Sequence, residues 1–367
     1  KCKCGPVELP VEPTNAIVLP AETVSPADAL NADAAAKIYA AKGRPSDNPL
    51  IVHIADTDAV EKLADLETMN RTHPDMVKKA HMLMEAFWPG PLTIIFPKLA
   101  IVPDGTTGGL PTVAIRMPSH PIAQELIRTS GVSIAAPSAN TSGRPSPTTA
   151  QHVWEDMDGR IEMILDGGAV GIGIESTIVD MTGTIPTILR PGFITKTMLS
   201  EIVGDVTIDP AIIEPDPNLR PKAPGMKYTH YAPHGTLSIV EAVADESANR
   251  ASLHSGVKVS YNATEAETLR VAEKIKALVN EKEAQGYKVA ILTTKEHASL
   301  YKNYSHVLIV GEGSKGQTIS ARLYAALREC DSEQMEYMYS EAFDQNELGG
   351  AIMNRLLKAA GHRVITV

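Results

Sequence analysis

The sequence predicts an α/β protein of two domains, and three observations support this prediction. The chain has 367 residues, whereas a single hydrophobic core stops growing at about 250 to 300 residues. Hydrophobic residues make up 43% and charged residues 21%, a balance typical of folded globular chains rather than disordered ones. Short apolar runs alternate with helical patterns along most of the chain, which indicates strands and helices in the same domains.

The first 208 residues predict a domain with a mixed sheet. Short apolar runs are separated there by helical patterns and by Pro/Gly turns. Helices are expected at 74–87, 121–129 and 147–156; Ser146 is the expected N-cap of the last and Pro147 its first residue. Strands are expected at 50–54, 92–96, 112–116, 133–136, 163–165, 176–180 and 187–189.

Proline is densest between Pro210 and Pro233. A segment so rich in proline holds neither a helix nor a central strand, so residues 209–235 are interpreted as a linker. From 236 to 367, strands and helices alternate at the spacing of a doubly wound parallel sheet, which predicts a smaller Rossmann-like domain. Its expected strands are 237–240, 288–292, 306–310, 335–339 and 363–367, and its expected helices are 264–284, 317–329 and 348–360.

Charge and cysteine content exclude several classes of protein. The formal net charge is -10, so nucleic-acid binding would need a local basic patch. The three cysteines, Cys2, Cys4 and Cys330, cannot form a disulfide framework, and Cys2 and Cys4 lack a second pair for a zinc site. No apolar run of about 18 residues and no signal-peptide pattern is present. We expect a cytoplasmic protein with no membrane partner.

Two clusters of polar residues are candidates for phosphate binding. Lys42 and Arg44 flank one glycine in a turn stiffened by Pro45 and Pro49, and paired cations suit a nucleotide phosphate; the alternative is a solvated basic turn. Ser138 and Asn140 follow an apolar strand and precede a helix start, where hydroxyl, amide and backbone N–H groups can bind phosphate and ribose. The alternative for this second cluster is an ordinary turn with an N-cap.

Two arginines close apolar strands. Arg116 and Arg190 are each placed to bind a carboxylate or phosphate at a sheet edge, although a structural salt bridge explains either one alone. Their occurrence together with Ser176 favours a ligand site. His53 on an apolar strand is, by itself, more often a core histidine.

The remaining motifs give little or no indication of a dinucleotide site, a nucleophile triad or a metal site. Residues 311–316 read Gly-Glu-Gly-Ser-Lys-Gly between a strand and a helix, which is the context of a dinucleotide site, with Glu341 as the candidate ribose partner. The match is incomplete, so a dinucleotide-dependent enzyme is a minor alternative. No Gly-x-Ser-x-Gly or His-Glu-x-x-His pattern is present, so neither a nucleophile triad nor a metal site is expected.

Six ordered motifs resemble the threonylcarbamoyl-AMP synthase family in its long, two-domain form. They are Lys42-x-Arg44-Pro45 with residues 48–53, Trp-Pro-Gly-Pro-Leu-Thr at 88–93, Val-Ala-Ile-Arg at 113–116, Ala-Pro-Ser-Ala-Asn at 136–140, Glu-Ser-Thr-Ile at 175–178, and Leu-Arg-Pro-Gly at 189–192. The linker at 223–233 and the closing segment from 348 to 355 are also similar. The resemblance covers nearly all of residues 16–367. It implies a YrdC-like mixed twisted sheet with helices around a central cavity, followed by the Rossmann-like domain.

The resemblance also implies an activity. The family joins L-threonine, bicarbonate or CO2, and ATP into threonylcarbamoyl-adenylate and pyrophosphate, and Mg2+ is expected to accompany ATP. A downstream threonylcarbamoyl transferase complex then modifies tRNA, so tRNA is an indirect partner. Such a reaction requires positioning and charge neutralisation more than a protein nucleophile.

Family motifs assign roles to individual positions. Lys42 and Arg44 are expected to be catalytic, and Thr23, His53, Arg116 and Ser176 to bind threonine. The linker is expected to cover the site as a lid. The expected ATP-binding residues are Arg44, Asn48, Thr112, Ser138, Asn140, Ser146, Arg190, Tyr228, His230 and Tyr231.

One segment departs from the family pattern. Residues 20–28 read Pro-Ala-Glu-Thr-Val-Ser-Pro-Ala-Asp, where the family has a longer motif with a tyrosine and two glycines. The loss of those glycines removes conformational freedom from this loop. A non-catalytic RNA-binding or regulatory protein on the same fold is therefore kept as the alternative function.

Overall fold

The computed structural model describes residues 17–19, 27–212, 222–224, 230–242, 264–343 and 348–367. The chain divides into two compact units. The first comprises Lys1–Ser142 and Pro147–Lys227, and the second comprises Gly143–Ser146 and Tyr228–Val367. The division after Lys227 falls inside the segment 209–235 that the sequence marks as a linker. The transfer of Gly143–Ser146 to the second unit has no counterpart in the expected domain limits.

The first unit is built on a seven-stranded sheet of order β5-β2-β4-β3-β7-β8-β9. The pairs β2–β4, β3–β7 and β8–β9 are parallel, and the pairs β2–β5, β3–β4 and β7–β8 are antiparallel. The sheet is therefore mixed, as the sequence predicts. Its strands are β2 (Ile51–His53), β3 (Leu92–Pro97), β4 (Thr112–Arg116), β5 (Ile134–Ala135), β7 (Thr177–Asp180), β8 (Thr187–Arg190) and β9 (Thr207–Ile208). A separate antiparallel pair joins β1 (Ile17–Leu19) to β6 (Met163–Leu165).

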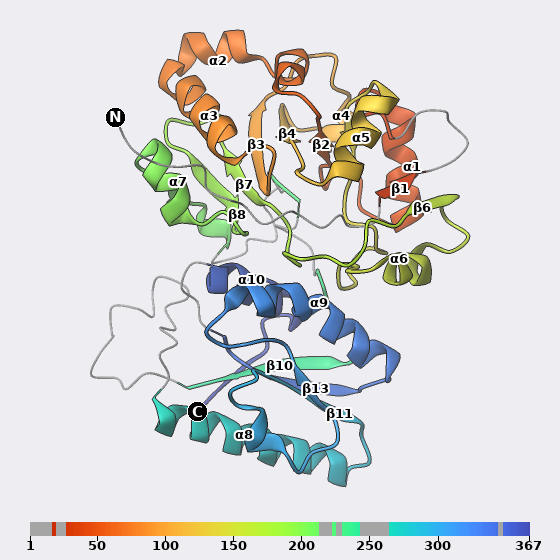
Figure 1. The fold of residues 1–367 in the computed structure, drawn as a ribbon, viewed down its shortest axis with the longest axis vertical. Coiled ribbons are helices and arrows are strands. Elements are labelled where there is room, and N and C mark those ends of the chain that lie inside the picture. Colours follow the sequence, from red (N-terminus) through yellow and green to blue (C-terminus); the bar gives the residue numbers. More distant parts are fainter. Residues whose placement is uncertain (1–16, 20–26, 213–221, 225–229, 243–263, 344–347) are drawn as a thin grey trace. The chain divides into compact units, whose positions relative to one another are not determined.

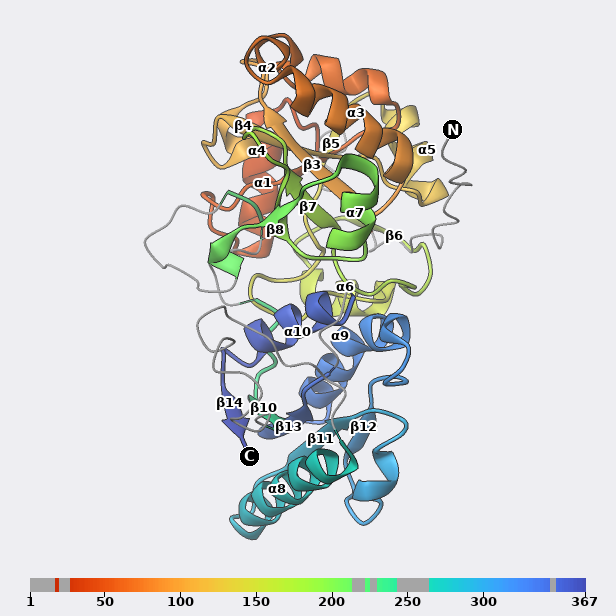
Figure 2. The same cartoon turned by 90° about the vertical axis from the view of Figure 1, so that its left-hand side faces the viewer.

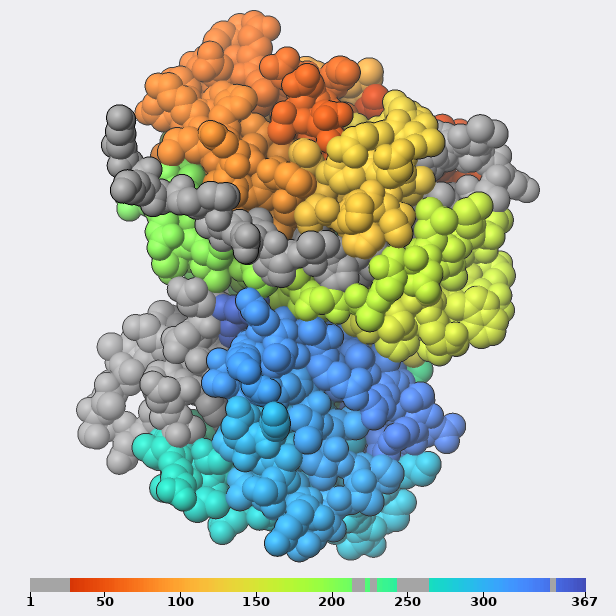
Figure 3. All heavy atoms as spheres, in the orientation of Figure 1, coloured from red at the N-terminus to blue at the C-terminus, as the bar shows by residue number. Residues whose placement is uncertain are grey.

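The main core of the first unit lies on one face of this sheet. There α3 packs through Leu83 and Phe87, and α7 through Leu199, against strand residues such as Ile94 and Ile115. In Figure 1 these two helices lie beside β3, β7 and β8, and in Figure 3 the surface passes from orange (α2 and α3) to yellow (α5). The helices of this unit are α1 (Ala32–Lys42), α2 (Leu66–Thr72), α3 (Pro74–Phe87), α4 (Asp104–Thr107), α5 (Pro121–Ser130), α6 (Ala150–Met157) and α7 (Lys196–Val203), with 3-10 turns η1 (Thr57–Lys62) and η2 (Pro210–Ile212).

The opposite face of the sheet carries a smaller apolar patch. Ile51, Ile95 and Ala114 belong to it, and Ala223 from the predicted linker is fully buried against them. Side chains two residues apart on a strand point to the same face. His53, Thr93 and Arg116 therefore lie on the face that Ala223 covers.

The second unit is a three-layer sandwich around a five-stranded parallel sheet of order β12-β11-β13-β10-β14. Helix α8 packs on one face through Val271 and Ile275, and α9 and α10 pack on the other through Leu323 and Leu356; Figure 2 shows the sheet between them. This confirms the predicted parallel sheet. The elements are β10 (Thr236–Glu241), α8 (Glu265–Ala284), β11 (Val289–Thr293), η3 (Ala298–Tyr301), β12 (Val307–Ile309), α9 (Gly316–Ser332), β13 (Tyr337–Glu341), α10 (Leu348–Ala359) and β14 (Val364–Thr366).

Two local details differ from the sequence-based expectation. Helix α6 begins at Ala150, and its N-cap is Thr149, whose side chain accepts a hydrogen bond from the N–H of His152; Ser146 does not cap it. Lys42 lies at the end of a helix rather than within a turn, and Gly43, in the left-handed conformation, ends that helix. The Ala-rich helix α1 has few large apolar residues, so its hydrophobic period is weak.

Candidate functional site

A row of polar side chains crosses the sheet of the first unit. His53 ends β2 and lies opposite Arg116 at the end of β4, and Arg116 lies opposite Thr93 on β3. Ser176 directly precedes β7, and Arg190 ends β8. Strand register thus brings together three residues predicted to bind threonine, His53, Arg116 and Ser176, and one predicted to bind ATP, Arg190.

Arg116 influences the charge state of its neighbour His53. Its Nε donates to the carbonyl of Gly90 at 3.2 Å, which orients the guanidinium. Burial, together with the nearby positive charge of Arg116, lowers the pKa of His53 to about 3. His53 is therefore a neutral imidazole at physiological pH, and Arg116 is the cation of this pair.

Ser176 lies in the middle of the row and contacts the residues on both sides. Its hydroxyl lies 2.7 Å from the hydroxyl of Thr93, and Arg190 donates to it at 3.1 Å and to the Ser176 carbonyl at 3.0 Å. All three residues are buried. Thr93 was not among the predicted site residues; a single hydroxyl in the apolar run Leu-Thr-Ile-Ile-Phe at 92–96 was the available signal.

Lys42 is buried at the end of α1, where only 5% of its surface is exposed. Its ammonium donates to the backbone carbonyls of Ser138 and Asn140. An ammonium has three N–H donors, so these two carbonyls leave one donor for a ligand. Burial lowers the pKa of Lys42 to about 7, and the charge of Arg44 lowers it in the same direction.

Arg44 and Asn48 form the neighbouring part of the site. Arg44 donates to the carbonyls of Asn48 and Pro49, at 3.2 Å and 2.9 Å. Oδ1 of Asn48 is buried without a hydrogen-bond partner among the described residues, and a buried polar atom of this kind is costly unless a ligand or water satisfies it. The parallel register of Ile51 with Ala114 puts Thr112 level with Pro49. Thr112 is therefore at the opposite end of β4 from Arg116, roughly 13 Å away.

The loop after β5 supplies carbonyls as well as side chains. Ser138 and Asn140 meet Lys42 there, as described above, and Asn140 is buried. The backbone N–H of Thr141 donates to the carboxylate of Asp156 at 3.2 Å, and the charge of Asp156 raises the pKa of Lys42, opposing the effect of burial. The structure thus brings Ser138, Asn140 and Lys42 together.

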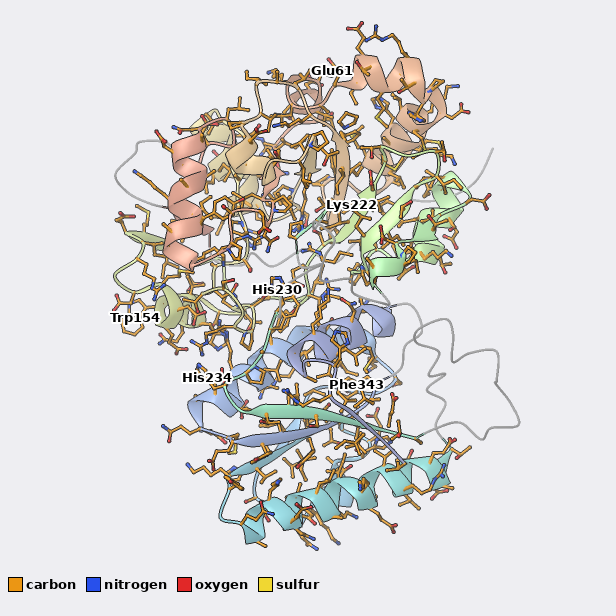
Figure 4. All side chains as sticks on the ribbon, turned by 180° about the vertical axis from the view of Figure 1, so that it is seen from behind. Glu61, Trp154, Lys222, His230, His234 and Phe343 are labelled. Atoms are coloured by element: carbon orange, nitrogen blue, oxygen red, sulfur yellow. The ribbon has the colours of Figure 1, made fainter. Side chains whose placement is uncertain are left out.

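Other residues with predicted roles belong to the second unit or lie outside the described residues. Ser146, His230 and Tyr231 belong to the second unit, where Ser146 and Tyr231 are buried. His230 is labelled in Figure 4, and its ring centroid lies 5.4 Å from that of Tyr231. Thr23 and Tyr228 lie outside the described residues. The expected roles of the site residues in ligand binding and catalysis remain predictions.

The glycine-containing turn of the second unit is already occupied by a carboxylate. The N–H of Gly313 donates to Glu296 at 2.8 Å, in the position where a dinucleotide site would bind pyrophosphate. Glu341 is buried and accepts hydrogen bonds from Thr293 at 3.0 Å and Tyr301 at 2.7 Å. These contacts disfavour a dinucleotide at this turn.

The described part of the chain contains neither a group of metal-binding side chains nor a reactive cysteine. No group of three or more His, Cys, Asp or Glu side chains there could hold a metal ion. Mg2+ that enters with ATP is bound mainly by phosphate and water, so it does not require such a group. Burial raises the pKa of the Cys330 thiol to about 12, which makes it unreactive. Among the described helices, none is both long and apolar enough to cross a membrane.

The site in the first unit suits two anionic ligands. Arg116 and Arg190 place positive charge in the polar row, and Lys42 and Arg44 place it beside Asn48 and the loop after β5. Guanidinium groups bind carboxylates and phosphates in a bidentate manner. The arrangement can hold an amino acid by its carboxylate and a nucleotide by its phosphates, without a protein nucleophile.

Comparisons with known proteins show the family to which the chain belongs. A Sua5/YciO/YrdC family model described as "Telomere recombination" matches residues 15–192, and a model described as "Threonylcarbamoyl-AMP synthase, C-terminal domain" matches residues 194–361. A crystal structure of Pyrococcus abyssi Sua5 complexed with L-threonine is 39% identical, with a TM-score of 0.79, covering 96% of this chain and 92% of that one.

Curated relatives from other organisms match over the same length. A threonylcarbamoyl-AMP synthase of Bacillus subtilis is 45% identical over 95% of this chain and 90% of its own. One of Schizosaccharomyces pombe is 35% identical over 94% of this chain and 84% of its own. These similarities extend through both units. The chain therefore belongs to the threonylcarbamoyl-AMP synthase family, an enzyme family, in its two-domain form.

Proposed function

We propose that this protein converts L-threonine, bicarbonate or CO2, and ATP into threonylcarbamoyl-AMP and pyrophosphate. The observation that carries the proposal is the polar row, in which Arg116 and Arg190 stand on either side of Thr93 and Ser176. The similarity to a Sua5 structure complexed with L-threonine supports threonine as the amino acid.

In this proposal Arg116 binds the threonine carboxylate and His53, as a neutral imidazole, hydrogen-bonds the same substrate. The threonine amine attacks CO2, a C–N bond forms, and the amine loses a proton to give a carbamate. A carbamate oxygen then attacks the α-phosphorus of ATP in line, and the bond to the β-phosphate oxygen breaks with loss of pyrophosphate. Both steps depend on holding the reacting atoms close together.

Lys42 and Arg44 act on the phosphate side of the reaction. The carbonyls of Ser138 and Asn140 fix the ammonium of Lys42, so its remaining donor has a set direction. Fixed donors stabilise developing phosphoryl charge without reorganising during the reaction. Mg2+ bound to the ATP phosphates would neutralise further charge.

The product would serve a transferase that acts on tRNA. Because the chain has a net charge of -10, a role that hands over a small adenylate fits it better than one that holds tRNA itself. The protein needs no extended basic surface for that role.

The direct test is pyrophosphate release from ATP by the purified protein. We expect release that requires both L-threonine and bicarbonate. No release, or release that does not depend on threonine, would contradict the proposal and favour the alternative of a non-catalytic role. The assay also shows whether the unusual segment 20–28 permits activity.

Variants of α1 provide the matched comparison. Lys42→Ala should lower turnover by at least about a hundredfold, because it removes a preorganised cation. Lys37→Ala, on an exposed position of the same helix, should leave turnover unchanged. Equal activity in both variants, with both folded by circular dichroism, would remove Lys42 from the mechanism.

A further inference from the structure

The loop from Ser138 to Ser142 is bonded to Lys42 at three points. The ammonium of Lys42 donates to the carbonyls of Ser138 and Asn140, and the N–H of Ser142 donates to the carbonyl of Lys42 at 2.9 Å. We call residues 138–142 the lysine-holding loop. This loop and Lys42 both belong to the first unit. The direction of the Lys42 ammonium therefore depends on the position of this loop.

Asp156 on helix α6 bonds the lysine-holding loop from its other side. The N–H of Thr141 donates to Oδ2 of Asp156 at 3.2 Å, and only 5% of Asp156 is exposed. The buried face of α6 consists of Val153, Asp156 and Met157, whereas Trp154, labelled in Figure 4, is 52% exposed. An amphipathic helix normally places apolar residues at all such buried positions. Packing alone therefore does not explain a carboxylate at this one.

The charge of Asp156 acts on Lys42, which is equally buried. A buried charge is costly unless an opposite charge compensates it, and only 5% of Lys42 is exposed. Burial lowers the pKa of Lys42 to about 7 and the charge of Arg44 lowers it as well, whereas the charge of Asp156 raises it. Asp156 thus favours the charged form of Lys42 in a place where burial favours the neutral form.

The other charged and titratable groups around Lys42 have different partners. Arg160, which follows α6, donates to the carbonyl of the residue before Lys42 at 3.2 Å. Burial raises the pKa of Tyr39, on the preceding turn of α1, to about 12, so its phenol is neutral at physiological pH. The charge of Asp47 also raises the pKa of Tyr39. Asp156 differs from these groups because it acts on both the loop and the ammonium.

We propose that Asp156 is a positioning residue for Lys42: its carboxylate fixes the lysine-holding loop through the N–H of Thr141, and its negative charge balances the buried ammonium. This inference rests on the proposed function, since it concerns the cation that acts on the ATP phosphates in that reaction. Asp156 acts through Lys42 and the loop rather than on a substrate. An ammonium that is held in place and kept charged needs little reorganisation when phosphate binds.

Nuclear magnetic resonance of protein labelled with 13C at the lysine Cε measures the pKa of Lys42 without any substrate. The signal of Lys42 is assigned by its loss in Lys42→Arg. In Asp156→Asn the amide oxygen can still accept from Thr141, but the negative charge is gone, so the pKa of Lys42 should fall by about 1. The matched control is Glu155→Gln, which removes a negative charge from an exposed position of the same helix. It should leave the pKa of Lys42 unchanged.

Isothermal titration with ATP measures the consequence for binding. A fall of the Lys42 pKa from about 7 to about 6 removes most of the remaining ammonium at alkaline pH. Asp156→Asn should therefore weaken ATP binding about tenfold at about pH 8 and only about twofold at about pH 6. Asp156→Glu keeps the charge and should restore the pH dependence of the unmodified protein. A merely structural role would weaken ATP binding equally at both pH values, and that result overturns the proposal.

A second neutral variant keeps the test decisive if Asp156→Asn does not fold. Asp156→Ser removes the same charge, and its smaller side chain lets water reach the N–H of Thr141. A pKa of Lys42 equal to that of the unmodified protein, in either folded neutral variant, overturns the proposal.

The resonance measurement also separates this proposal from the proposed function, because it needs no turnover. If the unmodified protein releases no pyrophosphate, the proposed function fails, and the titration of Lys42 still tests the role of Asp156. If pyrophosphate is released and the pKa of Lys42 does not respond to Asp156→Asn, the proposed function stands and the role of Asp156 is wrong.

Discussion

The two units place polar side chains at the ends of their sheet strands in different ways. In the first unit β4 and β8 end in Arg116 and Arg190, so the strand ends carry positive charge. In the second unit β13 ends in Glu341, which is buried and accepts from Thr293, His297 and Tyr301. Strand ends at similar places in a sheet can therefore carry either cations or a buried carboxylate with its own hydrogen-bond network. The sign of the charge and the partners it already has separate the two.

The comparison is tested most strongly by Arg116→Ala. Loss of the guanidinium should weaken threonine binding by about tenfold to a hundredfold, because a charged hydrogen bond to the carboxylate is lost. ATP binding should change by less than about twofold, the usual effect of a change away from a binding surface. Isothermal titration with each ligand measures both effects, with the exposed Arg71→Ala as control. Equal weakening of both ligands would contradict the division of the site.

Gly192→Ala tests the packing beneath the polar row. A Cβ at Gly192 would lie 2.5 Å from the backbone nitrogen of Thr177 and 2.7 Å from the carbonyl oxygen of Glu175. The backbone must shift to relieve these contacts, so we expect a loss of unfolding free energy of about 1 to 3 kcal/mol and weaker threonine binding. Gly183→Ala is the matched control, because its Cβ would lie 3.9 Å from the carbonyl oxygen of Ile185. Equal free energies of unfolding for the two variants in denaturant would refute the packing argument.

The depressed pKa of Lys42 predicts how nucleotide binding depends on pH. Because this pKa is lowered to about 7, the ammonium is charged below that pH and neutral above it. ATP binding should therefore weaken as pH rises through about 7. Near that pH, the binding of ATP should be accompanied by uptake of a proton by the protein. Calorimetry in buffers of different ionisation enthalpy measures this uptake. The same uptake in Lys42→Met would assign it to another group.

Glu341→Gln should have the smallest effect on activity. The hydrogen bond from His297 to Glu341 raises the pKa of His297. The stabilisation from this pair is present below the ordinary histidine pKa and is lost as pH rises through the raised value. We expect the variant to lose about 1 to 3 kcal/mol of stability at acidic pH, less at alkaline pH, and to keep both KM values. A large change in the KM of either substrate would show that the second unit's network belongs to the catalytic site.

Much of the fold could be predicted because its signals are local. Strand β4 occupies the predicted residues 112–116, and the predicted parallel sheet of the second unit is present. Some structural signals lie within a few consecutive residues of the sequence. Examples are the apolar strands bounded by Pro and Gly, and the capping box of Thr264 at the start of α8. The polar row could be anticipated in part, because Arg116 and Arg190 each close an apolar strand.

The errors come from contacts between distant residues. Ser146 followed by Pro147 has the form of a helix start, but the carbonyl of Ser146 is bound by Arg328 and the helix begins only after Thr149. Thr93 was missed because its partner, Ser176, approaches through the pairing of β3 with β7. A local pattern cannot show a hydrogen bond formed across the sheet.

The membership of Gly143–Ser146 in the second unit constrains how this protein can be shortened. A gene that ended after the first unit would lose Arg328, and the carbonyls of Pro145 and Ser146 would need other donors, from water or from new side chains. Loss of the second domain in evolution would therefore leave these carbonyls to water, or to donors introduced by substitutions in this loop. The same applies to a designed single-domain version, in which the loop between Ser142 and Pro147 is the first part to rebuild.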